Sequence, residues 1–331
     1  MSSTARNIRS LGQQNQVLKQ VWKFRSLYLM GSVAVLYFIV TKYLPLLLAI
    51  LAFKDYDPTL NDSAWIAIFQ SPWIGPTAEF PDRWFILGNM QVFVQSPYFL
   101  ELMRNTLVYS FAKLLLGLPM AIFLALALYE TILVKFRQIV QTITYLPHFL
   151  SWVIMLGVIQ GLLSPTDGLF NVIASSAGGQ TVNYMAEPFW FPFVVIISDM
   201  WKEMGWSAII FLAALMGIDP VLYEAADVEG ASRWQRLRFI TIPGITEVIV
   251  VVTLLRVGNI LDAGFQQLFM LYSLPVYSVG DILDTWVYRS GVLDFQLSLA
   301  TAVGIFKGVI GTGMLVLCNT VAKKITGNGL Y

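Results

Sequence analysis

The sequence predicts an all-α protein that crosses a membrane six times. Of its 331 residues, 57% are hydrophobic and only 12% are charged, whereas soluble domains carry about 25% charged residues. A helix needs about 20 mostly apolar residues to cross a bilayer core. Six stretches meet this requirement, at residues 28–51, 105–129, 139–163, 189–213, 241–262 and 298–321.

The distribution of basic residues predicts the orientation of these spans. Lys and Arg gather in the N-terminal tail 1–27, in the loop after the second span, in the loop 214–243 and around the C-terminal tail 324–331. Cytoplasmic loops are enriched in Lys and Arg. We therefore expect both termini and the 214–243 loop in the cytoplasm, with one transmembrane domain over 28–323 and a long external segment at 52–104.

Several site classes lack the residues they need. The chain has one cysteine, Cys318, and one histidine, His148, so we expect no disulfide framework and no metal site. A net charge of +1 gives no reason to expect a nucleic-acid partner. No G-x-x-x-x-G-K-[ST] phosphate loop is present, so we expect neither enzyme activity nor a cofactor in this chain.

The loop between the fourth and fifth spans is a polar insert, "YEAADVEGASRWQRLRFITIPG" at 223–244. Asp219 and Pro220 suit the start of a short helix over 220–229, and Gly230 suits a left-handed end to it. Ser232 is placed to cap a second short helix reaching Ile240, and Pro243 to start or kink the next span. On these signals alone, the insert is either a docking element or an amphipathic helix pair lying on lipid headgroups.

The insert resembles the EAA motif of binding-protein-dependent ABC importer permeases. That pattern is Glu-Ala-Ala, three residues, Gly, nine residues, Ile, one residue, then Leu-Pro. Ile242 stands where the motif has Leu, and the other motif positions are filled by Glu224, Ala225, Ala226, Gly230, Ile240 and Pro243. The resemblance implies that this loop is the coupling helix, which docks in a groove on a separate ATPase subunit.

Other segments are similar to sugar-importer permeases, among them "RNTLVYSFAKLL" (104–115) and "SDMWKEMGWSAIIFLAAL" (198–215). They are closest to the branch that imports oligosaccharides and polysaccharide fragments, such as alginate-oligosaccharide permeases. The resemblance implies a type I ABC importer permease in the bacterial inner membrane. It also implies a second permease, usually a different chain, two ATPase copies that bind ATP and Mg, and a periplasmic solute-binding protein.

Polar and aromatic residues inside the spans are candidates for an oligosaccharide pathway. Ionisable groups within a membrane usually face a cavity or a partner, and aromatic faces stack on sugar rings. We expect Asp199 and Lys202 to share a helix face, on which they can form a pair. The candidates are Trp152, Asp199, Trp201, Lys202, Trp206, Arg256, Asn259 and Gln266. Structural ion pairs and interfacial packing are the alternative roles of these residues, and the charge of the sugar stays open.

Two other functions remain as alternatives. An ATP-independent secondary transporter or channel would share the six spans but would have no use for the EAA spacing. A membrane enzyme is disfavoured, because "DVEGASR" lacks the downstream paired aspartates that a membrane phosphotransferase would need. Pro119 and Pro147 predict kinks or breaks, which suit a cavity that opens alternately to each side, and His148 is expected to be a packing or helix-end residue.

Overall fold

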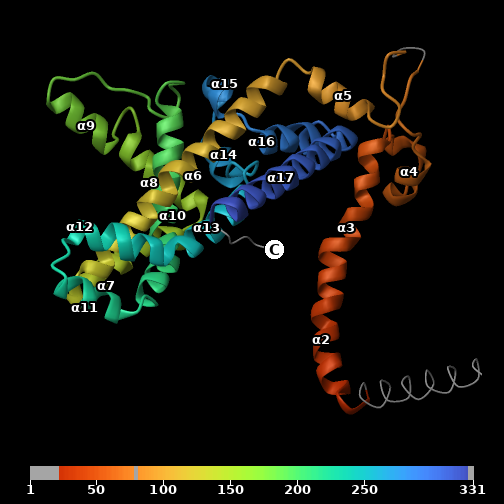
Figure 1. The fold of residues 1–331 in the computed structure, drawn as a ribbon. Coiled ribbons are helices and arrows are strands. Elements are labelled where there is room, and N and C mark those ends of the chain that lie inside the picture. Colours follow the sequence, from red (N-terminus) through yellow and green to blue (C-terminus); the bar gives the residue numbers. More distant parts are fainter. Residues whose placement is uncertain (1–21, 78–80, 327–331) are drawn as a thin grey trace, which may run out of the picture.

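The computed structural model describes residues 22–77 and 81–326, and this part of the chain is helical apart from its loops (Figure 1). Its one β contact is an isolated bridge between Lys54 and Trp73. Most of the N-terminal tail (1–21) and the end of the C-terminal tail (327–331) lie outside the described residues. The predicted all-α class is therefore confirmed.

Four helices are continuous and apolar enough to cross a membrane. Two of them are single α-helices and two combine several helical segments. They are α6 (Phe99–Glu130), α17 (Leu297–Thr326), the helix Arg25–Phe53 and the helix Arg233–Gly258. The third comprises α2 (Arg25–Phe38), a π turn (Ile39–Tyr43), α3 (Leu44–Leu46) and a 3-10 segment (Leu47–Phe53). The fourth comprises α12 (Arg233–Arg236), a π turn (Leu237–Thr241) and α13 (Ile242–Gly258).

Two further helix pairs are sharply bent. α7 (Val134–Tyr145), with a 3-10 turn at Leu146–Phe149, meets α8 (Trp152–Leu163) at 111°, and α10 (Phe191–Met216) meets α11 (Pro220–Val228) at 67°. The break predicted at Pro147 is therefore confirmed, and it divides the stretch 139–163 between α7 and α8. Pro147 lies in the 3-10 turn and Ser151 caps α8, so the chain changes direction between them. Pro119, in contrast, lies inside the continuous helix α6.

The second half of the polar insert is not a separate helix. It forms the first turns of the helix Arg233–Gly258, which corrects the expected end at Ile240 and the expected span 241–262. Pro243 is accommodated by the π turn before it, where the Ile242 N–H bonds to the Leu237 carbonyl five residues back. The same arrangement precedes Pro45, where the Leu44 N–H bonds to the Ile39 carbonyl. In both helices, a π turn allows a proline to lie in a continuous span.

Short elements gather at one end of the bundle, opposite α11 and α12 (Figure 1). They come from the predicted external segment and from the loops after the third and fifth spans. They are a 3-10 turn (Pro58–Leu60), α4 (Ala64–Gln70), α5 (Gly88–Gln95), α9 (Leu169–Ser176), α14 (Phe265–Leu271), a 3-10 turn (Leu274–Val276), α15 (Tyr277–Gly280), α16 (Leu283–Tyr288) and a π turn (Arg289–Leu293). We call this end of the bundle the outer end.

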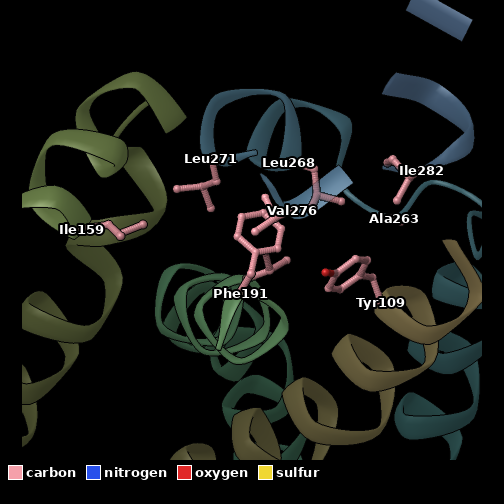
Figure 2. Close-up of a cluster of buried hydrophobic side chains, with 9 residues drawn as sticks. Tyr109, Ile159, Phe191, Ala263, Leu268, Leu271, Val276 and Ile282 are labelled. Atoms are coloured by element: carbon pink, nitrogen blue, oxygen red, sulfur yellow. The ribbon is translucent and has the colours of Figure 1, made fainter. Parts of the chain in front are cut away.

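A cluster of buried hydrophobic side chains packs α14 against the outer ends of α6, α8 and α10 (Figure 2). Phe191 and Leu268 are completely buried within it, and Tyr109 is 1% exposed. The Tyr109 hydroxyl donates to the Val279 carbonyl at 2.7 Å, so the buried polar group is satisfied. This cluster closes the bundle at its outer end. A second cluster packs α6, α10 and α13 together closer to α11, around Ala121, Ala125 and Phe211.

The first span is set apart from the rest of the bundle. None of its most apolar window is buried within the chain. Its 3-10 end packs against α17 and α5, while α2 extends away from the other helices (Figure 1). The hydrophobic side chains of α2 are exposed, and those of Leu29 and Met30 are 70% and 75% exposed.

Candidate functional site

The polar insert begins with a fully capped helix. The Asp219 carboxylate accepts from the Val221 N–H at 3.0 Å, and Pro220 is the first residue of α11. Gly230 ends the turn after α11 with φ of +72°. The Gly230 N–H bonds to the Asp227 carbonyl at 3.1 Å and the Ala231 N–H to the Ala226 carbonyl at 2.9 Å. These two bonds form a Schellman motif, so the predicted start and end of this helix are confirmed.

Side-chain contacts brace α11 against the helix that follows. Ser232 and Gln235 form a capping box at the start of α12. Asp227 is ion-paired with Arg236, and the Tyr223 hydroxyl lies 3.0 Å from that of Thr241. The insert is therefore a rigid corner joining α10 to the helix Arg233–Gly258.

The predicted coupling residues lie on and around this corner. Glu224, Ala225, Gly230 and Pro243 are exposed, whereas Ala226 and Ile240 are half-buried. Glu224 lines a pocket of about 330 Å³ together with Tyr129, Glu130, Arg233 and Arg236. A carboxylate and a small side chain are thus exposed at the end of the bundle opposite the outer end.

A chamber of about 390 Å³, lined by both ionisable and apolar side chains, lies where α6, α10 and α13 converge. Three predicted pathway residues, Asp199, Arg256 and Asn259, line it. It is also lined by Ser110, Lys113, Glu203 and Asp262. Asp262 follows the end of α13 at Gly258, so it lies beyond the helix that the sequence assigned to it. Lys113 is about 21 Å along the roughly 48 Å of α6, which places the chamber near the middle of the span.

Lys113 links three segments at the outer side of the chamber. Its ammonium lies 3.0 Å from the Asp199 carboxylate and donates to the Ala263 carbonyl at 2.8 Å and to Gln267 Oε1 at 2.5 Å. Gln267 in turn donates to the Val195 carbonyl at 2.7 Å. Gly264, with φ of +93°, leaves room for this arrangement, because a Cβ there would lie 2.6 Å from Lys113 Nζ.

Lys202 does not pair with Asp199, so that prediction was wrong. Lys202 is 6% exposed, and its ammonium donates to the carbonyl oxygens of Pro147, His148 and Leu150 at 3.2, 2.6 and 2.8 Å. These carbonyls lie at the break between α7 and α8, where the helical bonding pattern stops. Lys202 therefore satisfies the carbonyl oxygens that are left without helical partners at the break. It does not line the chamber.

Trp152, Trp201, Trp206 and Gln266 do not gather in one sugar-binding site. Trp206 stacks on His148 with ring centroids 4.7 Å apart, and His148 Nδ1 lies 3.0 Å from Glu203. Trp201 lines an apolar groove between α8 and α10, and Lys202 lies over the Trp152 ring at 5.7 Å. Gln266 is exposed, while its neighbour Gln267 is buried. Consecutive helical residues point about 100° apart, so Trp201 and Lys202 have different surroundings.

A cleft of about 610 Å³ opens at the outer end of α8. Asp167, Asn183 and Tyr272 are among the residues that line it. The Ser164 and Thr166 hydroxyls donate to the Asp167 carboxylate at 2.5 and 2.9 Å. These hydrogen bonds hold the pKa of Asp167 below its ordinary value, so the cleft presents a negative charge at neutral pH.

Comparison with known proteins identifies the class of molecule. Residues 104–326 match the model of the family described as "Binding-protein-dependent transport system inner membrane component". The polygalacturonan/rhamnogalacturonan transport system permease protein YteP of Bacillus subtilis is 37% identical over 96% of this chain and 94% of its own. Protein LplB of the same organism is 35% identical over 92% and 91%.

A solved structure has the same fold. It is a chain of a bacterial ABC transporter involved in the import of the acidic polysaccharide alginate. That chain is 35% identical, with a TM-score of 0.83 over 94% of this chain and 99% of that chain. The same values hold for the alginate transporter in complex with a periplasmic protein bound to an alginate pentasaccharide. The chain therefore belongs to the family of inner membrane components of binding-protein-dependent transport systems.

Proposed function

We propose that this chain is one membrane-spanning subunit of an ATP-driven importer for oligosaccharides. Its relatives support this substrate class, since YteP is named for polygalacturonan and rhamnogalacturonan transport and the similar solved structure belongs to an alginate importer. The sugar is delivered by a periplasmic solute-binding protein and passes through the chamber between α6, α10 and α13. The outer cleft beside α8 lies on the side from which that protein would approach.

The observation that carries the proposal is the braced and exposed corner at α11. A carboxylate at Glu224 and a small side chain at Ala225 lie outward on a helix that is capped at both ends. Such a surface allows close approach of another backbone and pairing with a basic group. The partner is a separate ATPase, present in two copies, that binds ATP and Mg.

The fold provides a mechanical path from this corner to the chamber. α10 leads into α11, and the helix Arg233–Gly258 leads out of the insert towards Arg256 and Asn259. A displacement of the corner therefore moves two chamber walls together. This geometry supports alternating access, in which closure of the ATPase dimer reorients the spans and no bond of the substrate is broken.

A second permease subunit, a different chain as the resemblance implies, completes the pathway. The exposed first span supports this, because its apolar surface is not covered within the chain. This chain lines the chamber from α6, α10 and α13 and from the loop after α13, and the second permease would line the pathway from the opposite side. The basic residues near α11, α12 and the end of α17 support a cytoplasmic position for both termini in the bacterial inner membrane.

Reconstitution in liposomes tests this function. Uptake of an oligosaccharide should require internal ATP, the ATPase and the external binding protein, and should be lost in Gly230→Val. Valine at φ of +72° is strained and would displace the end of α11. Ala231→Val is the matched control, since it places the same side chain one residue along. Uptake that needs no ATP and survives Gly230→Val would instead identify a secondary transporter.

A further inference from the structure

The chamber holds two cations whose surroundings differ. Lys113 is neutralised by Asp199 at 3.0 Å and its other contacts are the Ala263 carbonyl and Gln267. These three acceptors match the three N–H groups of an ammonium. Lys113 is therefore fully engaged within the chain and has no free donor for a ligand.

Arg256 is engaged differently. Within residues 22–77 and 81–326, no carboxylate lies within 4.0 Å of its guanidinium, and its one side-chain hydrogen bond runs from Nη2 to the Ser207 hydroxyl at 2.7 Å. A guanidinium has five N–H donors in a fixed fork. A Cβ at Gly117 would lie 3.6 Å from Arg256 Nη1, so no bulky side chain separates the fork from α6. A half-buried charge at this depth calls for a partner from outside the chain.

The chamber contains a second unused polar group. Ser110 is 8% exposed, and its hydroxyl has no hydrogen-bond partner in the described part of the chain. Ser198, by comparison, bonds to the Val194 carbonyl at 2.6 Å, four residues back. Ser110 lines the chamber with Arg256 and lies one helical turn from Lys113. The Ser110 hydroxyl is thus an unsatisfied buried group at the chamber wall, and a hydrogen bond from a ligand that reached it would satisfy it.

The carboxylates of the chamber do not prevent an anionic ligand from binding, because two of the three already contact basic side chains of this chain. Asp199 is paired with Lys113, and Glu203 contacts His148 at 3.0 Å and Lys202 at 4.0 Å. Asp262, which accepts from the Gly264 N–H at 3.4 Å, is the remaining carboxylate and is exposed beyond the end of α13. The Asp262 carboxylate can accept hydrogen bonds from sugar hydroxyls. The Arg256 guanidinium can donate hydrogen bonds to a carboxylate of the sugar.

Resting on the proposed function, we propose that the imported oligosaccharide carries carboxylates, as uronic acid units do, and that Arg256 binds one of them in the chamber. The planar guanidinium fork matches a carboxylate in bidentate geometry, and Ser110 binds a hydroxyl of the same ligand. Arg256 is thus a specificity-determining residue that selects acidic over neutral sugars during translocation. This selection is separate from that of the external binding protein.

The test compares ligands that differ only in charge. The assembled importer, purified in detergent without its binding protein, is titrated with galacturonate and alginate trimers and with their methyl esters. The wild type should bind an acidic trimer about ten- to a hundredfold more tightly than its ester, as expected for one charge-assisted contact. Arg256→Gln should remove this difference, and Arg256→Lys should restore part of it. Ser110→Ala should weaken acid and ester alike.

Arg137→Gln is the matched control, since it removes the same charge from α7, outside the chamber. Equal binding of acid and ester by the wild type, or an equal loss of both in Arg256→Gln with the complex still assembled, would overturn the assignment. Uptake of neutral oligosaccharides only would also overturn it. A complex that moves no sugar of any kind with ATP would refute the proposed function itself, and the inference with it.

Discussion

Arg236 and Arg256 lie on the same unbroken helix, one at the polar insert and the other in the chamber. Arg236 is ion-paired with Asp227 of α11, and Arg256 donates to Ser207 of α10 at 2.7 Å. About 20 residues separate them, which corresponds to about 30 Å along a helix. The two ends of this helix therefore contact the corner at α11 and the chamber, and under the proposed function its stiffness governs how movement passes between them.

Loosening this helix should uncouple the two ends. Val250→Gly with Val251→Gly places two flexible residues between Arg236 and Arg256 without touching the chamber lining. Each glycine weakens a helix by about 1 kcal/mol relative to alanine. The assembled importer should keep its basal ATP hydrolysis but lose its stimulation by the sugar-loaded binding protein. The paired alanine variant removes the same side chains and should retain stimulation, and an equal loss there would show that only packing mattered.

The Lys113–Asp199 pair should show strong energetic coupling. These side chains are 12% and 22% exposed, and removing one partner leaves a largely buried charge uncompensated. A double-mutant cycle with Lys113→Met and Asp199→Leu, followed by thermal unfolding in detergent, should give a coupling energy of about 2–3 kcal/mol. Asp227 is 60% exposed, so the parallel cycle with Arg236→Met and Asp227→Leu should give at most about 1 kcal/mol. Equal values would contradict this.

Lys202 should act on stability and not on sugar choice. Lys202→Met leaves three carbonyls at the broken span without their donor, and each buried unsatisfied group costs about 1–3 kcal/mol. The variant complex should unfold at a clearly lower temperature while its relative affinity for different sugars is unchanged. Lys135→Met, at an exposed position on α7, should have little effect. A changed sugar preference with normal stability would return Lys202 to the substrate path.

Two glycines with positive φ should differ in their tolerance of alanine. Gly264 has φ of +93° and an added Cβ would lie 2.6 Å from Lys113 Nζ, whereas Gly178 has φ of +82° and open space around it. The backbone term of about 1–2 kcal/mol is common to both. Gly264→Ala should therefore destabilise the protein more than Gly178→Ala in thermal unfolding. The reverse order would show that Lys113 does not hold the loop after α13 in place.

The sequence predicted best what depends on neighbouring residues. Asp219, Pro220, Gly230 and Ser232 act within a few residues of themselves, so the start and end of α11 and the cap of α12 followed from local rules. The apolar stretches located the helices for the same reason. The continuity through Pro243 was missed, because the compensating π turn has no sequence signature that we recognised.

Partners distant in sequence were not predictable in this way. Lys202 and the carbonyls it binds are more than 50 residues apart, as are the two residues of the Lys113–Asp199 pair. Helical spacing alone suggested the nearer partner for Asp199, and the packing of α6 on α10 decided otherwise. Ser110 gave no signal at all, since a serine within an apolar helix is ordinary and only its unused hydroxyl distinguishes it.

Under the proposed function, the corner at α11 docks on a separate ATPase. The most direct measurement is a gentle detergent pull-down of this chain from its native membranes, with partners identified by mass spectrometry. We predict that an ATPase and a second permease co-purify with the wild type and with Glu229→Lys, and that Glu224→Lys loses the ATPase. A chain that is purified alone, folded and able to move sugar without ATP would contradict the account.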